Sequence, residues 1–184
     1  FLAHGYDVTS WIYDAGEEAK LRELIGAAWE ALTELGLAPG ASQDRFTVTT
    51  DIADAVAKAD FVQESVPENL ALKQKVYAEL GMLVPEDVVI CSSTSGLTMT
   101  DIQTACATPE RTVTGHPFNP PYLMPLVEIV GGEKSDRDAV EWTGAFFKHA
   151  GKAPLVMERE VPGFVATRLQ EAIWREALHM VNEG

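Results

Sequence analysis

The sequence is poor in residues that several classes of protein require. Only two of the 184 residues are cysteines, Cys91 and Cys106, and their spacing is not that of a metal site. We therefore expect no metal and two reduced, buried thiols in a cytoplasmic protein. No apolar run approaches the ~20 residues that span a bilayer, so no membrane partner is expected. The first residues, from Phe1 to Gly5, lack the basic region and apolar core of a secretory signal.

Basic residues are also scarce. Fourteen lysines and arginines stand against 28 aspartates and glutamates, which gives a formal net charge of −14. Nucleic-acid binding calls for a basic face that attracts phosphates, so we expect no nucleic-acid partner. The acidic excess by itself indicates only a soluble surface.

Segments typical of strands alternate with segments typical of helices along most of the chain. Short β-branched or apolar runs predict strands, and apolar residues at helical spacing predict helices. We expect strands over residues 6–12, 46–50, 61–66, 88–92, 112–114, 126–130 and 153–157, and helices over 17–35, 52–59, 69–83, 100–107, 136–149 and 163–181. This order predicts an α/β fold with a doubly wound, mostly parallel Rossmann-type sheet.

The character of the chain changes near Pro162 and Gly163. Residues 1–160 alternate between strand and helix. Residues 161–184 contain only the long helix expected over 163–181, and we interpret them as the start of a second, helical domain. A doubly wound nucleotide-binding sheet opens with a strand, a G-x-G-x-x-G turn and a helix, and no such turn is present. We expect that the first strand and turn are missing only from this chain, because the sheet would otherwise have unpaired edges.

One proline-rich segment brings a histidine close to a carboxylate. In GHPFNPP at 115–121, His116 and Asn119 each precede a proline, which favours an extended backbone at both and predicts that the histidine lies on a stiff loop. Glu128 follows on the next expected strand. A histidine oriented by a carboxylate is a suitable general base near neutral pH. The alternative interpretation is a surface loop with an incidental histidine.

Five motifs resemble one known family when they are taken together in this order. They are QESVPENL at 63–70 with Lys73, SSTSGL at 92–97, GHPFNP at 115–120, LVEIVGGE at 126–133 and VPGF at 161–164. The chain resembles the 3-hydroxyacyl-CoA dehydrogenase superfamily along essentially its whole length. The SSTSG and HPFNP segments, with WREALH at 174–179, are most similar to its carnitine-oxidising branch.

The resemblance implies an NAD-dependent oxidoreductase and assigns roles to individual residues. His116 resembles the catalytic base and Glu128 its carboxylate partner. Ser95 resembles the serine that hydrogen-bonds the reacting oxygen of the substrate and also lies beside the cofactor. The other residues implied to contact the cofactor are Asn119 and the pair formed by Glu68 and Lys73. Read without the resemblance, Glu68 is a carboxylate at a helix start and Lys73 a solvated helix charge.

Two positions depart from the family pattern. An acidic residue normally ends the second strand and binds the adenosine ribose. Here Ile12 stands at that position and Asp14 follows two residues later, so Asp14 is a weaker candidate for the ribose contact. Thr167 stands where acyl-CoA relatives usually carry an asparagine that touches substrate. We retain Thr167 as a candidate substrate residue, although threonine offers a hydroxyl in place of an amide.

The expected reaction is oxidation of the 3-hydroxyl of L-carnitine to 3-dehydrocarnitine with NAD. Tyr122 and Trp174 could hold the trimethylammonium group by cation–π contact, worth ~0.5–2 kcal/mol, or could simply be packing residues. The alternative substrates are a 3-hydroxyacyl-CoA, such as 3-hydroxybutyryl-CoA, or L-gulonate. A non-enzymatic alternative is a catalytically inactive relative of the crystallin type. The resemblance further implies a cytoplasmic homodimer built through the helical C-terminal domain.

Overall fold

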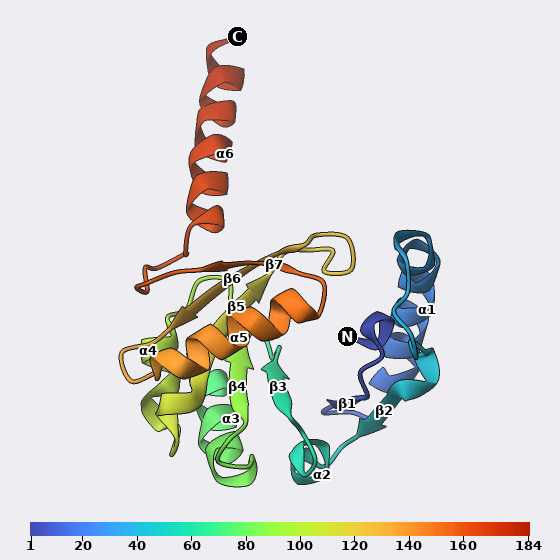
Figure 1. The fold of residues 1–184 in the computed structure, drawn as a ribbon. Helices are drawn as coiled ribbons and strands as arrows, with labels where there is room; N and C mark the ends of the chain where they lie inside the picture. Colours follow the sequence, from blue (N-terminus) through green and yellow to red (C-terminus); the bar gives the residue numbers. More distant parts are fainter.

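The computed structural model describes residues 1–184 and has the expected α/β character (Figure 1). Its strands are β1 (Val8–Trp11), β2 (Phe46–Thr49), β3 (Phe61–Glu64), β4 (Val89–Ser92), β5 (Thr112–Pro117), β6 (Leu126–Gly131) and β7 (Ala153–Val156). Its α-helices are α1 (Glu17–Leu35), α2 (Ile52–Val56), α3 (Leu70–Leu83), α4 (Met99–Ile102), α5 (Arg137–His149) and α6 (Ala166–Glu183). Short 3-10 turns occur at Leu2–His4, Gln43–Arg45, Gln103–Ala105 and Pro109–Arg111. Every expected strand and helix is present, and α1 has the predicted bounds.

The strands form two sheets. β1 and β2 pair in parallel, and the other five strands run in the order β3-β4-β5-β6-β7. Neighbours in the larger sheet are parallel except for β5 and β6, which are antiparallel. The mostly parallel sheet predicted from the sequence is therefore confirmed. The carboxyl ends of β3, β4 and β5 lie at one edge of the larger sheet, which is where open α/β sheets bind ligands.

The structure corrects the expected position of His116, which lies in a strand and not on a loop. β5 continues to Pro117 because it pairs with β6 along this stretch, with His116 opposite Glu128. Glycine and proline are poor strand formers, so the sequence pattern alone ends the strand at Thr114. β4 pairs with β5 only as far as Thr114. The end of β5 is therefore free on that side, where a residue without an N–H is tolerated.

Alternate residues of the sheet face two separate apolar clusters. Ile90 packs with Tyr77 and the rest of the cluster under α3 and α4, whereas Val89 and Cys91 face Phe147 of α5 on the other side. This period of two is what a strand with both faces covered should show. Both cysteines are buried and free, as the sequence predicted.

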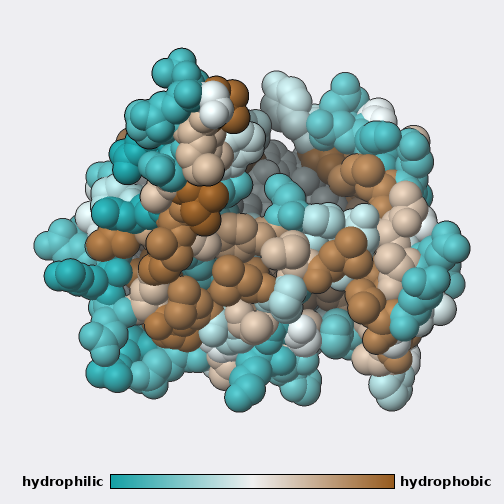
Figure 2. All heavy atoms as spheres, turned by 90° about the horizontal axis from the view of Figure 1, so that it is seen from above, coloured by the Kyte–Doolittle hydropathy of each residue, from teal (hydrophilic) through white to brown (hydrophobic).

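α6 leaves the body of the molecule and projects away from the sheet (Figure 1). None of its residues is buried against the rest of this chain, and Trp174 is 58% exposed. Figure 2, seen from the side on which α6 projects, shows apolar surface gathered there. The large exposed apolar residues include Leu169, Ile173, Leu178, Met180 and Val181 of α6, and Tyr122, Leu123 and Met124 of the β5–β6 connection. No helix combines the length and the apolar character needed to cross a membrane.

Candidate active site

His116 and Glu128 face each other on adjacent antiparallel strands. They are direct partners in the register of β5 and β6. The imidazole Nδ1 lies 3.0 Å from Glu128 Oε2, within hydrogen-bonding distance. The His116 residue is 6% exposed and Glu128 is 0% exposed, so the contact is largely shielded from water. Because a carboxylate only accepts hydrogen bonds, Nδ1 carries the proton in the neutral imidazole and Nε2 is left as an acceptor.

The second oxygen of Glu128 binds the start of α6. Oε1 accepts hydrogen bonds from the backbone N–H groups of Val165 at 2.8 Å and Ala166 at 2.7 Å. The first N–H groups of a helix have no partner inside the helix, and a carboxylate there also meets the positive end of the helix dipole. Glu128 therefore joins the histidine to the first turn of a helix 37 residues further along the chain.

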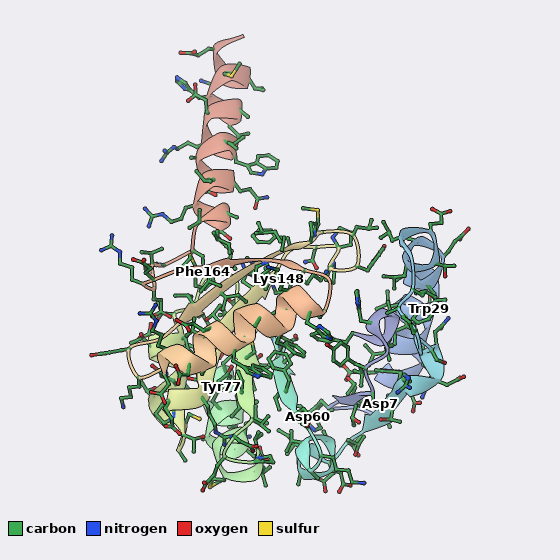
Figure 3. All side chains as sticks on the ribbon, viewed as in Figure 1. Asp7, Trp29, Asp60, Tyr77, Lys148 and Phe164 are labelled. Carbon is green, nitrogen blue, oxygen red and sulfur yellow. The ribbon has the colours of Figure 1, made fainter.

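Two phenylalanines fix the environment of the imidazole. The ring centroid of His116 lies 4.6 Å from that of Phe118 and 5.7 Å from that of Phe164. Phe164 is fully buried, and Figure 3 labels it in the region between the sheet and the start of α6. Gly163 and Phe164 both have positive φ, 72° and 50°, and this left-handed turn redirects the chain into α6. The sequence offered no signal for this role of Phe164 beyond its place in the VPGF motif.

Ser95 lies on the tight turn that follows β4. Its side chain makes no hydrogen bond and the residue is exposed, so its hydroxyl is free for a ligand. Its backbone is held by Glu68, whose Oε1 accepts from the amides of Ser95, Gly96 and Leu97 at 3.1, 3.1 and 3.4 Å. The same oxygen accepts from Thr94 Oγ1 at 2.6 Å. Burial raises the pKa of the Glu68 carboxyl, but the Thr94 hydroxyl, the Lys73 charge and the amides outweigh it and lower the pKa overall.

Lys73 is a buried charge and not the solvated one that its helical position suggested. Its side chain is 1% exposed, and Nζ lies 2.8 Å from Oε1 and 3.1 Å from Oε2 of Glu64. The expected partner, Glu68, is further away, with Oε2 3.6 Å from Nζ. Sequence reasoning missed Glu64 as the main partner. The alternation in β3 places Val62 and Glu64 on the face that packs against α3. This alternation could have indicated Glu64 as a partner of Lys73.

Neighbouring polar groups complete the surroundings of Glu64. Its Oε2 accepts from Ser92 Oγ at 2.7 Å and its Oε1 from the Val66 amide at 2.6 Å. Burial, followed by the Glu64 charge, raises the pKa of the Cys91 thiol well above its usual range. That thiol is therefore neutral and unreactive near pH 7.

The other three predicted site residues are more loosely connected to this group. Asn119 is exposed in the connection directly after β5 and precedes a cis peptide bond to Pro120. Asp14 is exposed on the turn after β1, where its Oδ1 accepts from the Gly16 amide at 2.9 Å, and it contacts none of the other candidates. Thr167 lies in the first turn of α6, beside the residues that bind Glu128, and lines an open surface pocket of about 480 Å³.

The uncommitted polar groups at this edge match part of a dinucleotide. The side-chain amide of Gln63, near the end of β3, is buried and has no hydrogen-bond partner. The hydroxyl of Ser95 and the amide of Asn119 are exposed, and they offer donors and acceptors suited to a carboxamide and to hydroxyl groups. The residues present therefore fit the nicotinamide half of NAD. The sequence has no glycine-rich turn, so none of its residues is assigned to the phosphates.

Comparison with known proteins identifies the family. The profile described as 3-hydroxyacyl-CoA dehydrogenase, NAD binding domain, matches residues 1–161. The chain belongs to this family. NAD is the cofactor that the family description names. L-carnitine dehydrogenase from Streptomyces griseus subsp. griseus is 60% identical over 184 residues, and L-carnitine dehydrogenase from Pseudomonas putida is 50% identical over 183 residues. Both alignments cover 100% of this chain, which spans 55% and 57% of those two proteins.

Solved structures share the fold. A 5-formyl-3-hydroxy-2-methylpyridine 4-carboxylic acid 5-dehydrogenase, described as an NAD⁺-dependent dismutase, superposes with a TM-score of 0.92 at 36% identity over 100% of this chain and 60% of its own. The 3-hydroxybutyryl-CoA dehydrogenase of Escherichia coli K12 gives 0.89 at 28% identity over 99% of this chain and 39% of its own. The predicted α/β class is therefore confirmed in relatives with different substrates.

Proposed function

We propose that the full-length protein oxidises the 3-hydroxyl group of L-carnitine to 3-dehydrocarnitine with NAD as hydride acceptor. The single observation that supports the chemistry is the buried His116–Glu128 pair at the ligand-binding edge of the sheet, with Nδ1 and Oε2 3.0 Å apart. Support for the substrate comes from the relatives named L-carnitine dehydrogenase, of which one is 60% identical. The chain spans just over half of those relatives, so the activity is proposed for the whole protein.

In this mechanism the residues of the chain move one proton and orient one hydroxyl. Because Glu128 fixes the proton of the neutral imidazole on Nδ1, the Nε2 atom of His116 accepts the hydroxyl proton of the substrate. The Glu128 carboxylate then stabilises the imidazolium. The hydroxyl of Ser95 donates to the reacting oxygen. When bound, NAD supplies the acceptor for the hydride that leaves carbon.

The remaining candidates have supporting roles in the proposal. Asn119 and Lys73 lie at the cofactor side, where Asn119 would hold the carboxamide and Lys73 would keep the local charge balanced. Thr167, beside the first turn of α6, would contact the substrate. Asp14 would reach the adenosine ribose. Truncation of Asn119, Asp14 or Thr167 to alanine should raise the KM for the ligand concerned, whereas removal of Lys73 should act mainly on stability.

Substrate choice is tested by comparing two substrates on one enzyme preparation. Purified full-length protein is supplied with NAD and either L-carnitine or 3-hydroxybutyryl-CoA, and NADH formation is followed by its absorbance. We expect kcat/KM to be much higher for L-carnitine. Turnover of only the CoA ester would replace the carnitine proposal by the acyl-CoA one. Absence of turnover with NAD bound would favour the inactive, crystallin-like alternative.

The base assignment is tested with a pair of histidine variants. His116→Ala removes the proton acceptor and should lower kcat by roughly 10²–10⁴-fold. His149→Ala, at an exposed position at the end of α5, is the matched control and should leave kcat unchanged. A His116→Ala protein with near-normal kcat would contradict the assignment.

We further propose that residues 161–184 begin a helical dimerisation domain and that the full-length protein is a homodimer. Support comes from the exposed apolar side chains of α6, among them Ile173 at 69% and Val181 at 81% exposure. A solvated helix with this composition needs a partner surface. Light scattering on the full-length protein should give the mass of a dimer, and Ile173→Asp should reduce it. A monomeric wild-type protein would contradict this proposal.

A further inference from the structure

The turn after β4 forms a concave set of backbone amides. The N–H groups of Ser95, Gly96 and Leu97 point toward one place, which is the geometry that binds anions in many proteins. In this chain the anion is part of the protein, because Glu68 Oε1 occupies that place. The Thr94 hydroxyl supplies a fourth donor at 2.6 Å. The amides are therefore committed to Glu68 and are not free to bind a ligand phosphate.

A second carboxylate holds the same turn from its buried side. Glu64 Oε2 accepts from Ser92 Oγ, and Ser92 Oγ in turn accepts from the Thr94 amide at 3.2 Å. Lys73 lies between the two carboxylates, 2.8 Å from an oxygen of Glu64 and 3.6 Å from one of Glu68. The turn is thus fixed at both ends by one network of three charges.

The side-chain hydroxyls of Ser92, Ser93 and Thr94 each make a hydrogen bond within the protein, and that of Ser95 does not. The hydroxyl of Ser95 has no hydrogen-bond partner and is exposed, while its backbone amide is tied to Glu68. A network that fixes the backbone and leaves a single hydroxyl free is suited to aiming that hydroxyl. The backbone position of Ser95 is therefore tied to the carboxylate of Glu68.

We propose that Glu68 is a positioning residue that aims the Ser95 hydroxyl, beyond the cofactor contact that the family resemblance implies for it. This inference rests on the proposed function, in which Ser95 donates to the reacting oxygen. Loss of Glu68 should therefore act mainly on kcat, as loss of Ser95 does. A residue whose main role is to bind NAD should instead act mainly on the KM for NAD.

The kinetic test is a double-mutant cycle in the full-length protein. Ser95→Ala should lower kcat by roughly 10²-fold, which is the usual effect of removing one such donor. Glu68→Ala should lower kcat by a similar factor. The double variant should be no slower than the slower single variant, because both substitutions remove the same contribution of the Ser95 hydroxyl. Glu68→Gln keeps an acceptor oxygen and should recover most of the rate. Glu79→Ala, at an exposed position of α3, is the control.

Three kinetic outcomes would overturn the inference. Multiplicative losses in the double variant would show that the two residues act independently. A rise in the KM for NAD with unchanged kcat in Glu68→Ala would make Glu68 a cofactor ligand only. A wild-type kcat in Ser95→Ala would remove the role of Ser95 in the proposed function, and the inference with it. Failure of the enzyme to oxidise L-carnitine contradicts only the substrate proposal, and the cycle is then measured with 3-hydroxybutyryl-CoA.

A second measurement is independent of activity. Hydrogen exchange of the amides of Ser95, Gly96 and Leu97 should accelerate at least tenfold in Glu68→Ala and much less in Glu68→Gln, while exchange in β4 stays unchanged. Equal protection of these amides in wild type and Glu68→Ala would overturn the inference even if no substrate is turned over. Faster exchange throughout the protein would reduce Glu68 to a general structural role.

Discussion

Glu128 binds His116 with one carboxylate oxygen and the first amides of α6 with the other. Oε2 lies 3.0 Å from Nδ1, and Oε1 lies 2.7 Å from the nitrogen of Ala166. The two contacts require different things of the side chain. The histidine requires an acceptor at Nδ1, which selects its tautomer, whereas the helix requires an acceptor for its unpaired N–H groups.

Glu128→Gln should separate these two requirements. The amide oxygen will remain on the helix N–H groups, since the NH₂ group would meet donors there, and the NH₂ group will face His116. Nδ1 must then accept, the ring proton moves to Nε2, and the base is lost. We expect kcat to fall by roughly 10²-fold or more with little change in stability.

Glu128→Ala is the comparison variant because it also removes the acceptor for the helix. It should lose both activity and stability, by roughly 0.5–2 kcal/mol for the lost acceptor at the start of the helix. Steady-state kinetics and urea unfolding check both variants. A Glu128→Gln protein with wild-type kcat would show that the tautomer of His116 does not control the reaction.

Removal of Lys73 should be strongly destabilising. Lys73→Met leaves the carboxylate of Glu64 buried without its counter-charge, which should lower the free energy of unfolding by about 3–5 kcal/mol. Adding Glu64→Gln removes the uncompensated charge and should recover a large part of that loss. Lys75→Met, at an exposed position of the same helix, is the control and should change stability little. Urea unfolding with equal effects of the two lysine substitutions would contradict the prediction.

Gly115 has no room for a side chain. A Cβ atom there would lie 2.5 Å from Cys91 Sγ and 2.9 Å from a ring carbon of Phe147. Gly115→Ala should therefore destabilise the protein by about 1–3 kcal/mol and disturb the neighbouring His116. Adding Cys91→Ala removes the closer contact and should restore part of the stability. Gly26→Ala, where a Cβ meets nothing within 4 Å, should be neutral or slightly stabilising in the same thermal unfolding experiment.

Glu68 should make stability depend on pH in the acid range. Its pKa in the folded protein is lowered, so the unfolded chain binds the proton more readily. The contribution of Glu68 is therefore fully present above the ordinary glutamate pKa of about 4.3 and is lost as pH falls through the lower folded value. The unfolding midpoint of wild type minus that of Glu68→Gln should be constant above about pH 5 and decrease below about pH 4. A difference independent of pH over this range would contradict the prediction.

The parts of the fold that the sequence predicted are those with a strong local signal. α1 was bounded correctly because its apolar spacing ends at Gly36, whose φ of 103° is unsuited to a helix. The meeting of His116 and Glu128 was also predicted. Their direct register was not, because the strand pairing that extends β5 to Pro117 depends on a neighbour that local propensity does not include.

The contacts that sequence reasoning missed are tertiary. Nothing in the local pattern around Lys73 distinguishes Glu64 from Glu68 as its partner, since that choice depends on which face of β3 packs against α3. The hydrogen bonds from Val165 and Ala166 to Glu128 were likewise not predicted from the sequence, because they join residues 37 and 38 positions apart. The roles of the site residues themselves remain predictions for the experiments above.

The shared carboxylate of Glu128 means that the imidazole and the first turn of α6 cannot move independently. A shift of the helix by an ångström would stretch bonds of 2.7–2.8 Å and turn the carboxylate, and the ring would turn with it. A force on the far end of α6 would therefore be transmitted through the carboxylate to the imidazole. Under the proposed mechanism the placement of α6 becomes a condition for turnover, although the helix itself carries neither His116 nor Glu128.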